Sequence, residues 1–256
     1  PREPYEGLDI DLFVAEMAAL EPAQPLVYHP RLIGASRNHL AYTLAERDYG
    51  HDGSPGPPEF TGAQSQERAL FAGYPAERGV VAECAGSYIH GGILGNHWSL
   101  LVDDGPGGDH GMQAGRGHRM SLVNGRYREF GNGSIAHPDG RWGEVSLCSP
   151  GANERLVGGV AYLDLDGDRF YDIGEGVGGL AIEREGGGAV RTWASGAYRL
   201  EAGGPGELVL RATLLDLVVE GTAPASSDNF KFDVELSEAV LAHWRGLVAT
   251  LGKSNK

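Results

Sequence analysis

Residues 127–135, YREFGNGSI, and residues 141–148, RWGEVSLC, read as two β-strands on either side of a turn. The segment between them contains His137-Pro138-Asp139-Gly140, in which proline and glycine favour a tight turn. The stretch therefore predicts an antiparallel hairpin. Because segments with helical spacing precede it, we expect helices to flank a short antiparallel sheet, which gives an α+β domain with three layers.

Three segments upstream of the hairpin carry helix signals. In residues 9–20, apolar side chains recur at the spacing of one helix face. Residues 30–48 begin with a proline, which suits the first turn of a helix, and residues 66–74 predict a further helix that ends on a glycine. Residues 50–58 contain three glycines and three prolines and therefore predict a surface loop between these two helices.

Three short motifs contain side chains that can hold a metal ion or move a proton. They are Tyr49-Gly50-His51 after the long helix, Val81-Ala82-Glu83-Cys84 in a predicted strand, and Arg116-Gly117-His118-Arg119 after a glycine-rich loop. Two imidazoles and one carboxylate suit zinc or a similar divalent ion with an open position. Without a metal, the same groups could act as general acid and base, with the pKa of Glu83 raised by burial. A polar cluster that only ties helices to the sheet is the third possibility.

In this order, the motifs resemble the CAP superfamily of cysteine-rich secretory, antigen 5 and pathogenesis-related 1 proteins, and specifically its bacterial members. The resemblance covers about residues 5–149 and implies a CAP-like α/β/α sandwich over residues 1–150. In that family, a histidine after the second helix, a glutamate in a Gly-Glu-Asn motif and a histidine in a Gly-His-Arg motif converge on a cleft. The resemblance therefore implies that His51, Glu83 and His118 bind a metal there and, in an enzyme, act as the catalytic residues.

The chain departs from the family pattern at two places. Alanine and cysteine flank Glu83, where the family has glycine and asparagine, and the second cleft glutamate of the family has no clear counterpart. Asp103 or Asp104 is the nearest candidate for that fourth position, which stays open. Because two negative charges are unfavourable at a helix C-terminus, we expect a compensating cation beside them, Arg116 or Arg119.

Other cysteines and histidines leave alternatives open. Cys84 and Cys148 both fall on predicted strands. A disulfide between them would need Cα atoms within ~7 Å and an oxidising compartment, and two buried free thiols are the alternative. His90, His97 and His110 could each line the cleft or serve as surface or capping residues.

After Ser149-Pro150-Gly151 the sequence changes to short strands and turns, and we place a domain boundary there. Residues 164–175, DLDGDRFYDIGE, then place five carboxylates in a twelve-residue loop. These are Asp164, Asp166, Asp168, Asp172 and Glu175, at positions 1, 3, 5, 9 and 12. Calcium prefers six to eight such oxygen ligands. A glycine at position 4 and an arginine at position 6 exclude a helix–loop–helix calcium motif, and a solvated acidic turn is the alternative.

Around this loop the strands resemble the B-type repeats of bacterial surface adhesins, over about residues 157–234. The resemblance implies a small antiparallel β-sandwich at residues 157–235, in which a structural calcium ion pins two strands. Residues 236–251 have helical spacing, so we expect a C-terminal helical tail at residues 236–256.

The composition limits the possible partners and locations. The 256-residue chain has a net charge of −14 and lacks a basic stripe or a long apolar run. We therefore expect neither nucleic-acid binding nor membrane insertion. The chain begins at Pro1, as a processed protein would, and we expect a secreted, periplasmic or cell-surface location. The sequence favours no particular oligomeric state.

Two functions follow from the resemblances. The first is a secreted bacterial CAP-like protein that binds a metal or ligand in its cleft and carries a structural calcium site, with an extracellular polymer or a small ligand as partner. The alternative is a hydrolase or lyase that acts on an extracellular polymer, such as a polysaccharide, in the same cleft. A purely adhesive role would leave the cleft without a function. Serine-hydrolase, phosphate-loop and dinucleotide-binding motifs are absent from the sequence.

Overall fold

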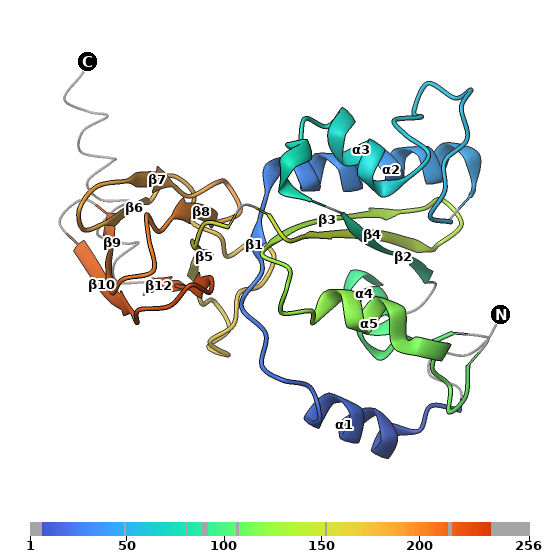
Figure 1. The fold of residues 1–256 in the computed structure, drawn as a ribbon, viewed down its shortest axis with the longest axis horizontal. Helices are drawn as coiled ribbons and strands as arrows, with labels where there is room; N and C mark the ends of the chain where they lie inside the picture. Colours follow the sequence, from blue (N-terminus) through green and yellow to red (C-terminus); the bar gives the residue numbers. More distant parts are fainter. Residues whose placement is uncertain are drawn as a thin grey trace. The chain divides into compact units, whose positions relative to one another are not determined.

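The computed structural model describes residues 7–48, 50–79, 81–88, 92–105, 108–151, 153–214 and 217–236. It contains helices and several mostly antiparallel sheets and therefore has an α+β fold (Figure 1). The chain divides into two compact units. Residues 1–24 and 29–152 form the first unit, and residues 25–28 and 153–256 form the second. None of the described helices is long and apolar enough to cross a membrane.

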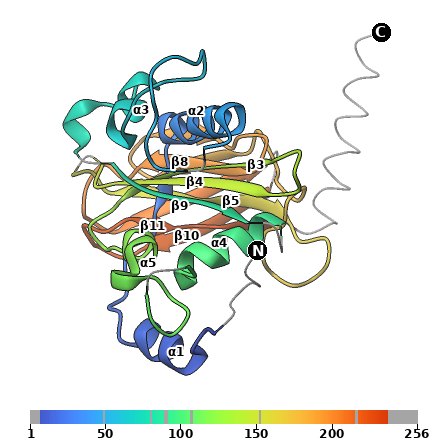
Figure 2. The same ribbon diagram turned by 90° about the vertical axis from the view of Figure 1, so that its right-hand side faces the viewer.

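The first unit places helices on both faces of an antiparallel sheet. Its elements are α1 (Ile10–Ala18), α2 (Pro30–Glu46), α3 (Ser65–Phe71), the 3₁₀ helix η1 (Ala76–Arg78), β2 (Ala82–Tyr88), α4 (Gly92–Val102), the 3₁₀ helix η2 (Ala114–Arg116), α5 (Gly117–Leu122), β3 (Glu129–Ala136) and β4 (Trp142–Ser149). The predicted hairpin is confirmed, because β3 and β4 pair antiparallel, and β2 pairs with the other side of β4. Figure 2 shows α2 and α3 over one face of this sheet and α4 and α5 over the opposite face.

Close packing of α2 on the sheet depends on Gly131 of β3. A Cβ atom at this position would lie 2.2 Å from the carbonyl carbon of Leu32. Ser36, one turn further along α2, donates a hydrogen bond to the carbonyl of Gly131 (3.0 Å). Leu32, Ala35 and Leu147 are fully buried in the core beside this contact. A glycine in the central hairpin thus sets the distance between helix and sheet.

Two helices of the first unit have bounds that the sequence did not predict. α4 spans Gly92–Val102, and α5 begins at Gly117, so that His118 lies in a helix and not at the end of a loop. Glycines within α4 weaken its intrinsic helix propensity and obscure its spacing. Burial of Asn96, Ser99 and Leu100 stabilises the helix in its tertiary setting.

The two cysteines are free and buried. Cys84 on β2 lies opposite Ser146, and Cys148 on β4 lies opposite Ala82. The structure therefore has two unpaired thiols in adjacent strands. Burial raises the pKa of Cys148 to about 12, which keeps this thiol protonated and unreactive at neutral pH.

The second unit consists of two small sheets around one core. The strands of these sheets are β5 (Leu156–Leu163), β6 (Ala181–Arg184), β7 (Ala189–Arg191), β8 (Ala197–Glu201), β9 (Leu208–Leu214), β10 (Leu217–Ala223), β11 (Phe230–Lys231) and β12 (Val234–Leu236). The short strand β1 (Val27–Tyr28) also falls within this unit but is in neither of its two sheets. One sheet has the order β10-β9-β6-β7, and the other is built around β5. Val157, Tyr198, Ile182 and Leu210, which come from both sheets, share the same buried core.

The sheet around β5 differs from the antiparallel sandwich that the sequence predicted. β8 pairs with β5 antiparallel, but β11 and β12 pair with it in parallel. Parallel pairing needs a crossover connection, and here the chain forms β6 to β10, including the antiparallel partner β8, before it reaches β11. The short segment at Pro25 also belongs to this unit, since Asn229 Nδ2 donates a hydrogen bond to the carbonyl of Pro25 (2.9 Å). The helical tail predicted at residues 236–256 lies outside the described residues except for Leu236, which ends β12.

Candidate functional site

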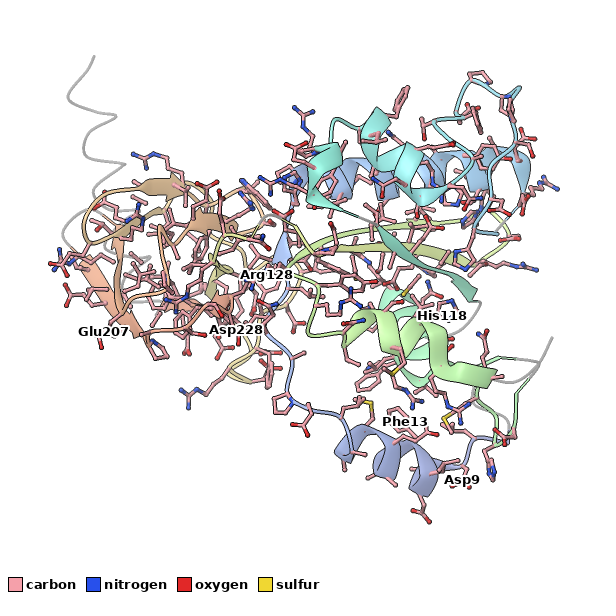
Figure 3. All side chains as sticks on the ribbon, in the orientation of Figure 1. Asp9, Phe13, His118, Arg128, Glu207 and Asp228 are labelled. Atoms are coloured by element: carbon pink, nitrogen blue, oxygen red, sulfur yellow. The ribbon has the colours of Figure 1, made fainter. Side chains whose placement is uncertain are left out.

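The three predicted cleft residues meet at β2, the strand at one edge of the first unit's sheet. His51 lies in the loop after α2 and Glu83 lies on β2. His118 lies on α5, where Figure 3 labels it. His51 Nδ1 and Glu83 Oε1 are 3.0 Å apart. The ring centroids of His51 and His118 are 6.1 Å apart, and the two ring planes make an angle of 29°. Residues that are distant in the sequence are thus brought together on one strand edge.

Glu83 has a second partner, the guanidinium of Arg68. Arg68 Nη2 donates a hydrogen bond to Glu83 Oε2 (2.7 Å), and both side chains are almost completely buried. Burial alone would raise the pKa of Glu83, but the hydrogen bond from His51 and the positive charge of Arg68 outweigh it and lower the pKa. The prediction that burial raises the pKa of Glu83 is therefore wrong, because it did not include Arg68.

Arg68 is a member of the site that sequence reasoning missed. It lies on α3 and is 1% exposed. Besides Glu83, it donates hydrogen bonds to the backbone carbonyls of Gly62, Ala63 and His51. One side chain therefore fixes both the carboxylate and the loop that carries His51. The available sequence signal was a single arginine in a predicted helix, which is most often a surface residue.

The hydrogen bond with Glu83 also acts on the imidazole. It raises the pKa of His51, and the loss of solvation only partly opposes this effect. The His51 side chain is 53% exposed, whereas that of Glu83 is 4% exposed. The pair therefore presents a solvent-accessible imidazole on a buried, negatively charged support.

His118 is held in the same way by Asp103. Asp103 Oδ1 lies 2.9 Å from His118 Nδ1, and its Oδ2 accepts a hydrogen bond from the backbone N–H of His118 (2.9 Å). Asp103 is 1% exposed and adopts a left-handed backbone conformation with φ of 62°. Of the two aspartates considered for the fourth position, Asp103 is therefore the one that contacts His118. Asp104 instead forms an isolated β-bridge with Met112.

Arg119 provides the cation expected near these aspartates, but it acts on carbonyl groups. Its guanidinium donates hydrogen bonds to the carbonyls of Leu101 (2.9 Å) and Val102 (2.6 Å) at the C-terminus of α4. It also forms an ion pair with Glu16 of α1 and lies over the Phe13 ring, 4.9 Å from its centroid (Figure 3). The positive charge therefore stabilises the end of α4 beside the aspartate that positions His118.

Both imidazoles use Nδ1 for a carboxylate, which leaves their Nε2 atoms for a ligand. A histidine that binds a metal usually donates its other ring N–H to a carboxylate or carbonyl group. Glu83 and Asp103 occupy this supporting position. Within the part of the chain that the structure describes, three donor atoms lie within 4.8 Å of one another only at Asp164, Asp166 and Asp168. His51, Glu83 and His118 therefore do not form the predicted group of three metal ligands, and the site offers two imidazole nitrogens with two orienting carboxylates instead.

A cavity of about 260 Å³ adjoins His118. Asn96 and Ser99 of α4, both buried, contribute polar groups to its wall, and Ser87 and Gln113 line it as well. Because the lining includes amide and hydroxyl groups, the cavity suits a small polar ligand.

Two more histidines of the first unit have carboxylate partners. His97 Nδ1 lies 2.8 Å from Oε1 of the buried Glu144, and His110 Nδ1 lies 3.0 Å from Asp9 Oδ2. The hydrogen bond with Glu144 raises the pKa of His97. Neither histidine is part of the His51–His118 pair. His90 lies outside the described residues.

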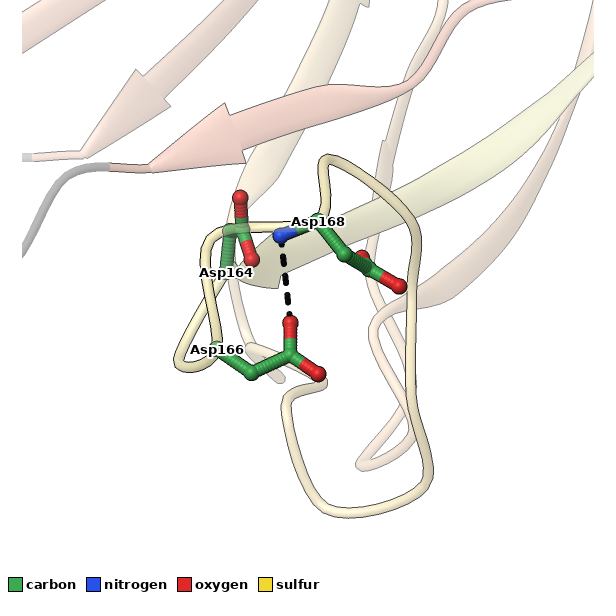
Figure 4. A group of neighbouring side chains, drawn as sticks. All are labelled: Asp164, Asp166 and Asp168. Atoms are coloured by element: carbon green, nitrogen blue, oxygen red, sulfur yellow. Dashed lines mark hydrogen bonds between the residues drawn. The ribbon is translucent and has the colours of Figure 1, made fainter.

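The acidic loop of the second unit brings three of its five predicted calcium ligands together. Carboxylate oxygens of Asp164, Asp166 and Asp168 lie within 4.8 Å of one another (Figure 4). Glu175 is not in this group, because its two oxygens accept hydrogen bonds from the backbone N–H groups of Leu165 (2.7 Å) and Asp172 (2.8 Å). Asp172 is also outside it. Partial desolvation and then the neighbouring negative charges raise the pKa of Asp172.

Neither the family models nor the curated proteins contain a match to this chain. Among solved structures, an outer surface protein of Borrelia burgdorferi aligns with 58% of this chain and 95% of its own chain. The two sequences are 15% identical, and the TM-score is 0.36.

Proposed function

We propose that the first unit is a CAP-like binding domain whose cleft binds a divalent metal ion, such as zinc, or a small ligand through Nε2 of His51 and His118. The supporting observation is that each imidazole Nδ1 has its own buried carboxylate, Glu83 or Asp103. Such carboxylates fix the ring and increase its strength as a ligand. Zinc held by two imidazoles would keep positions for water or a bound molecule.

The same proposal includes the partner and the location. The cavity beside His118 has room for a small polar molecule or for one unit of an extracellular polymer. The resemblance to CAP and adhesin proteins supports a secreted, periplasmic or cell-surface location. Helices on both faces of an antiparallel sheet are compatible with CAP-like α/β/α layering.

A structural calcium ion in the second unit completes the proposal. Three carboxylates within 4.8 Å repel one another, and a cation would remove this repulsion. Asp164, Asp166 and Asp168 would be its side-chain ligands. Glu175 would stabilise the loop without binding the ion, since its carboxylate already accepts hydrogen bonds from the backbone N–H groups of Leu165 and Asp172.

The alternative function is a hydrolase or lyase that uses the same cleft on a polymer such as a polysaccharide. The observation in its favour is that His51, whose pKa is raised, stacks with His118, which lines a cavity. In that case Glu83 would stay ionised and orient His51, and His51 Nε2 would exchange the proton. Glu83 itself would not donate a proton, because its pKa is lowered.

Zinc titration of the full-length protein by calorimetry tests the binding proposal. His51→Ala and His118→Ala should each remove measurable zinc binding, whereas His97→Ala should leave it unchanged. His97 is the matched control, because it also pairs with a buried carboxylate but is not part of the cleft pair. Equal affinity in the parent protein and His118→Ala would contradict the proposed site. Turnover of a polysaccharide by the parent that is lost in Glu83→Gln would favour the enzyme instead.

A further inference from the structure

The second unit has a cavity of its own, of about 370 Å³. Five of its fourteen lining residues are aromatic: Tyr28, Tyr162, Phe170, Tyr171 and Tyr198. Aromatic residues make up only 8% of the chain, so the cavity wall is strongly enriched in them. All of the lining residues belong to the second unit.

The aromatic wall combines fixed rings with exposed ones. Tyr162 and Tyr198 are almost fully buried, and their hydroxyl groups donate hydrogen bonds to the carbonyls of Arg169 and Phe232. The Tyr162 and Tyr171 rings meet edge to face, with centroids 6.3 Å apart. In contrast, Phe170 is 74% exposed. Hydrogen bonds of the buried tyrosines therefore fix the wall, while the exposed ring of Phe170 is available to a ligand.

Each charged group of the wall has a partner of opposite charge. Lys231 Nζ lies 2.6 Å from Asp233 Oδ2, and Arg169 lies 3.9 Å from Glu235. Asp233 Oδ1 also accepts a hydrogen bond from the backbone N–H of Val160 (3.0 Å), which fixes its position. The lining itself carries two cations, Arg169 and Lys231, and one anion, Asp233, and Glu235 outside the lining pairs with Arg169. Its chemistry favours a neutral molecule with many hydroxyl groups.

We propose that this cavity binds a neutral oligosaccharide. A pyranose ring has an apolar C–H face, which packs on an aromatic side chain such as Phe170, and hydroxyl groups, which hydrogen-bond to Lys231 and Asp233. A pocket with mostly apolar walls and a few fixed polar groups is typical of selective small-molecule sites. A proline-rich peptide also packs on aromatic side chains, but it would leave the Lys231–Asp233 pair without a role. The site lies in the second unit and does not depend on metal binding in the cleft.

Calorimetric titration of the full-length protein tests this site, with cellohexaose, chitohexaose, maltohexaose and a decaproline peptide as probes. At least one of the three saccharides should bind. Phe170→Ala should then weaken its binding about tenfold, the effect expected for one lost aromatic contact. Ile173→Ala is the matched control, because Ile173 lies in the same loop, is 86% exposed and does not line the cavity.

Three results would overturn the proposal: no binding of any saccharide, binding of decaproline alone, or an equal loss in Phe170→Ala and Ile173→Ala. Zinc titration of the same parent protein reports on the cleft separately, so a failure of the cleft proposal is distinguishable from a failure here. Because Phe170 is exposed, its variant should fold normally, and circular dichroism checks this.

Discussion

Glu83 is a buried carboxylate with two positively polarised partners that face it from different elements. Arg68 donates a hydrogen bond to one carboxylate oxygen and favours the ionised form, and His51 forms a hydrogen bond with the other oxygen. Its role at the residue scale is therefore to hold an imidazole in one orientation. Asp103 does the same for His118 and additionally accepts hydrogen bonds from the first N–H groups of α5.

The His51–Glu83 pair should make zinc binding depend on pH. Since the hydrogen bond with Glu83 raises the pKa of His51 above its usual ~6.5, the imidazole stays protonated to a higher pH and cannot bind metal there. Zinc affinity should rise with pH and level off only above this raised pKa. Calorimetry across a pH series should show the midpoint at lower pH in Glu83→Gln, and an unchanged midpoint would contradict the proposed coupling.

The same pair contributes to stability with the opposite dependence on pH. A group whose pKa is raised by folding stabilises the fold fully below its unfolded value of ~6.5, and this contribution is lost as the pH rises through the raised pKa of His51. The lowered pKa of Glu83 acts at the acid end, where its contribution is lost as the pH falls through that value. The contribution of this pair to the stability of the fold is therefore largest at pH values between the lowered pKa of Glu83 and the raised pKa of His51.

Asp103→Asn should weaken zinc binding by about 10- to 100-fold, the usual cost of losing a carboxylate that supports a metal-binding histidine. Asparagine keeps the size and an acceptor for the α5 backbone but removes the charge beside His118 Nδ1. Asp109→Asn is the control, because the Asp109 side chain is 79% exposed. Should both variants bind zinc like the parent, Asp103 would be a helix cap and nothing more.

Sequence patterns predicted part of this constellation. The trio His51, Glu83 and His118 came from short motifs, and the structure brings its members together at β2. Asp103 was one of two candidates, and only its contact with His118 distinguishes it from Asp104. Arg68 was not predictable, because its partners come from the loop before α3 and from β2, and their convergence is a property of the fold.

At the scale of elements, the close contact between α2 and Gly131 of β3 can be tested by adding a side chain at Gly131. Gly131→Ala would place a methyl group against the backbone of Leu32, at a distance of 2.2 Å from its carbonyl carbon. Overpacking of this kind should lower the unfolding free energy by roughly 1–3 kcal/mol or more. Urea denaturation measures the change, and Gly125→Ala is the control, since its nearest neighbour would be Ala23 at 3.8 Å. Equal stability of both variants would show that α2 can move away from the sheet.

The elements themselves were predicted unevenly. α2, α3 and the β3–β4 hairpin follow from periodicity, proline positions and turn residues. Only the C-terminal end of α4 was expected, beside Asp103; its extent was not predicted, because its glycines obscure the spacing of a helix that tertiary burial stabilises. The parallel partners of β5 escaped prediction because strand direction depends on how the chain returns from the other sheet, which residue patterns do not encode.

For the whole molecule, two units with separate cores predict two thermal transitions. In calcium buffer, a chelator should lower the transition of the second unit alone. A hundredfold excess of ligand over its dissociation constant contributes about 2.7 kcal/mol, which corresponds to a shift of roughly 10 °C or more for a unit of this size. Differential scanning calorimetry measures both transitions.

Variants identify which transition belongs to the calcium loop. Asp164→Asn combined with Asp168→Asn should reproduce the effect of the chelator, and Gly131→Ala should shift only the other transition. Asp172→Asn should have a smaller effect, because Asp172 lies outside the carboxylate group. A chelator without effect on either transition would mean that the loop is an acidic turn without an ion.

The membership of residues 25–28 in the second unit has a consequence for biosynthesis. This segment leaves the ribosome long before β5 exists, yet Asn229 bonds to Pro25, and Val27 fills the space that a side chain at position 158 would need. The second unit therefore cannot finish folding until β11 and β12 have been translated. All segments of the first unit have been translated earlier. For the same reason, a fragment that starts at Asn153 would lack a segment of its own fold, and a circular permutant that joins Pro25–Tyr28 to it by a linker would restore that segment.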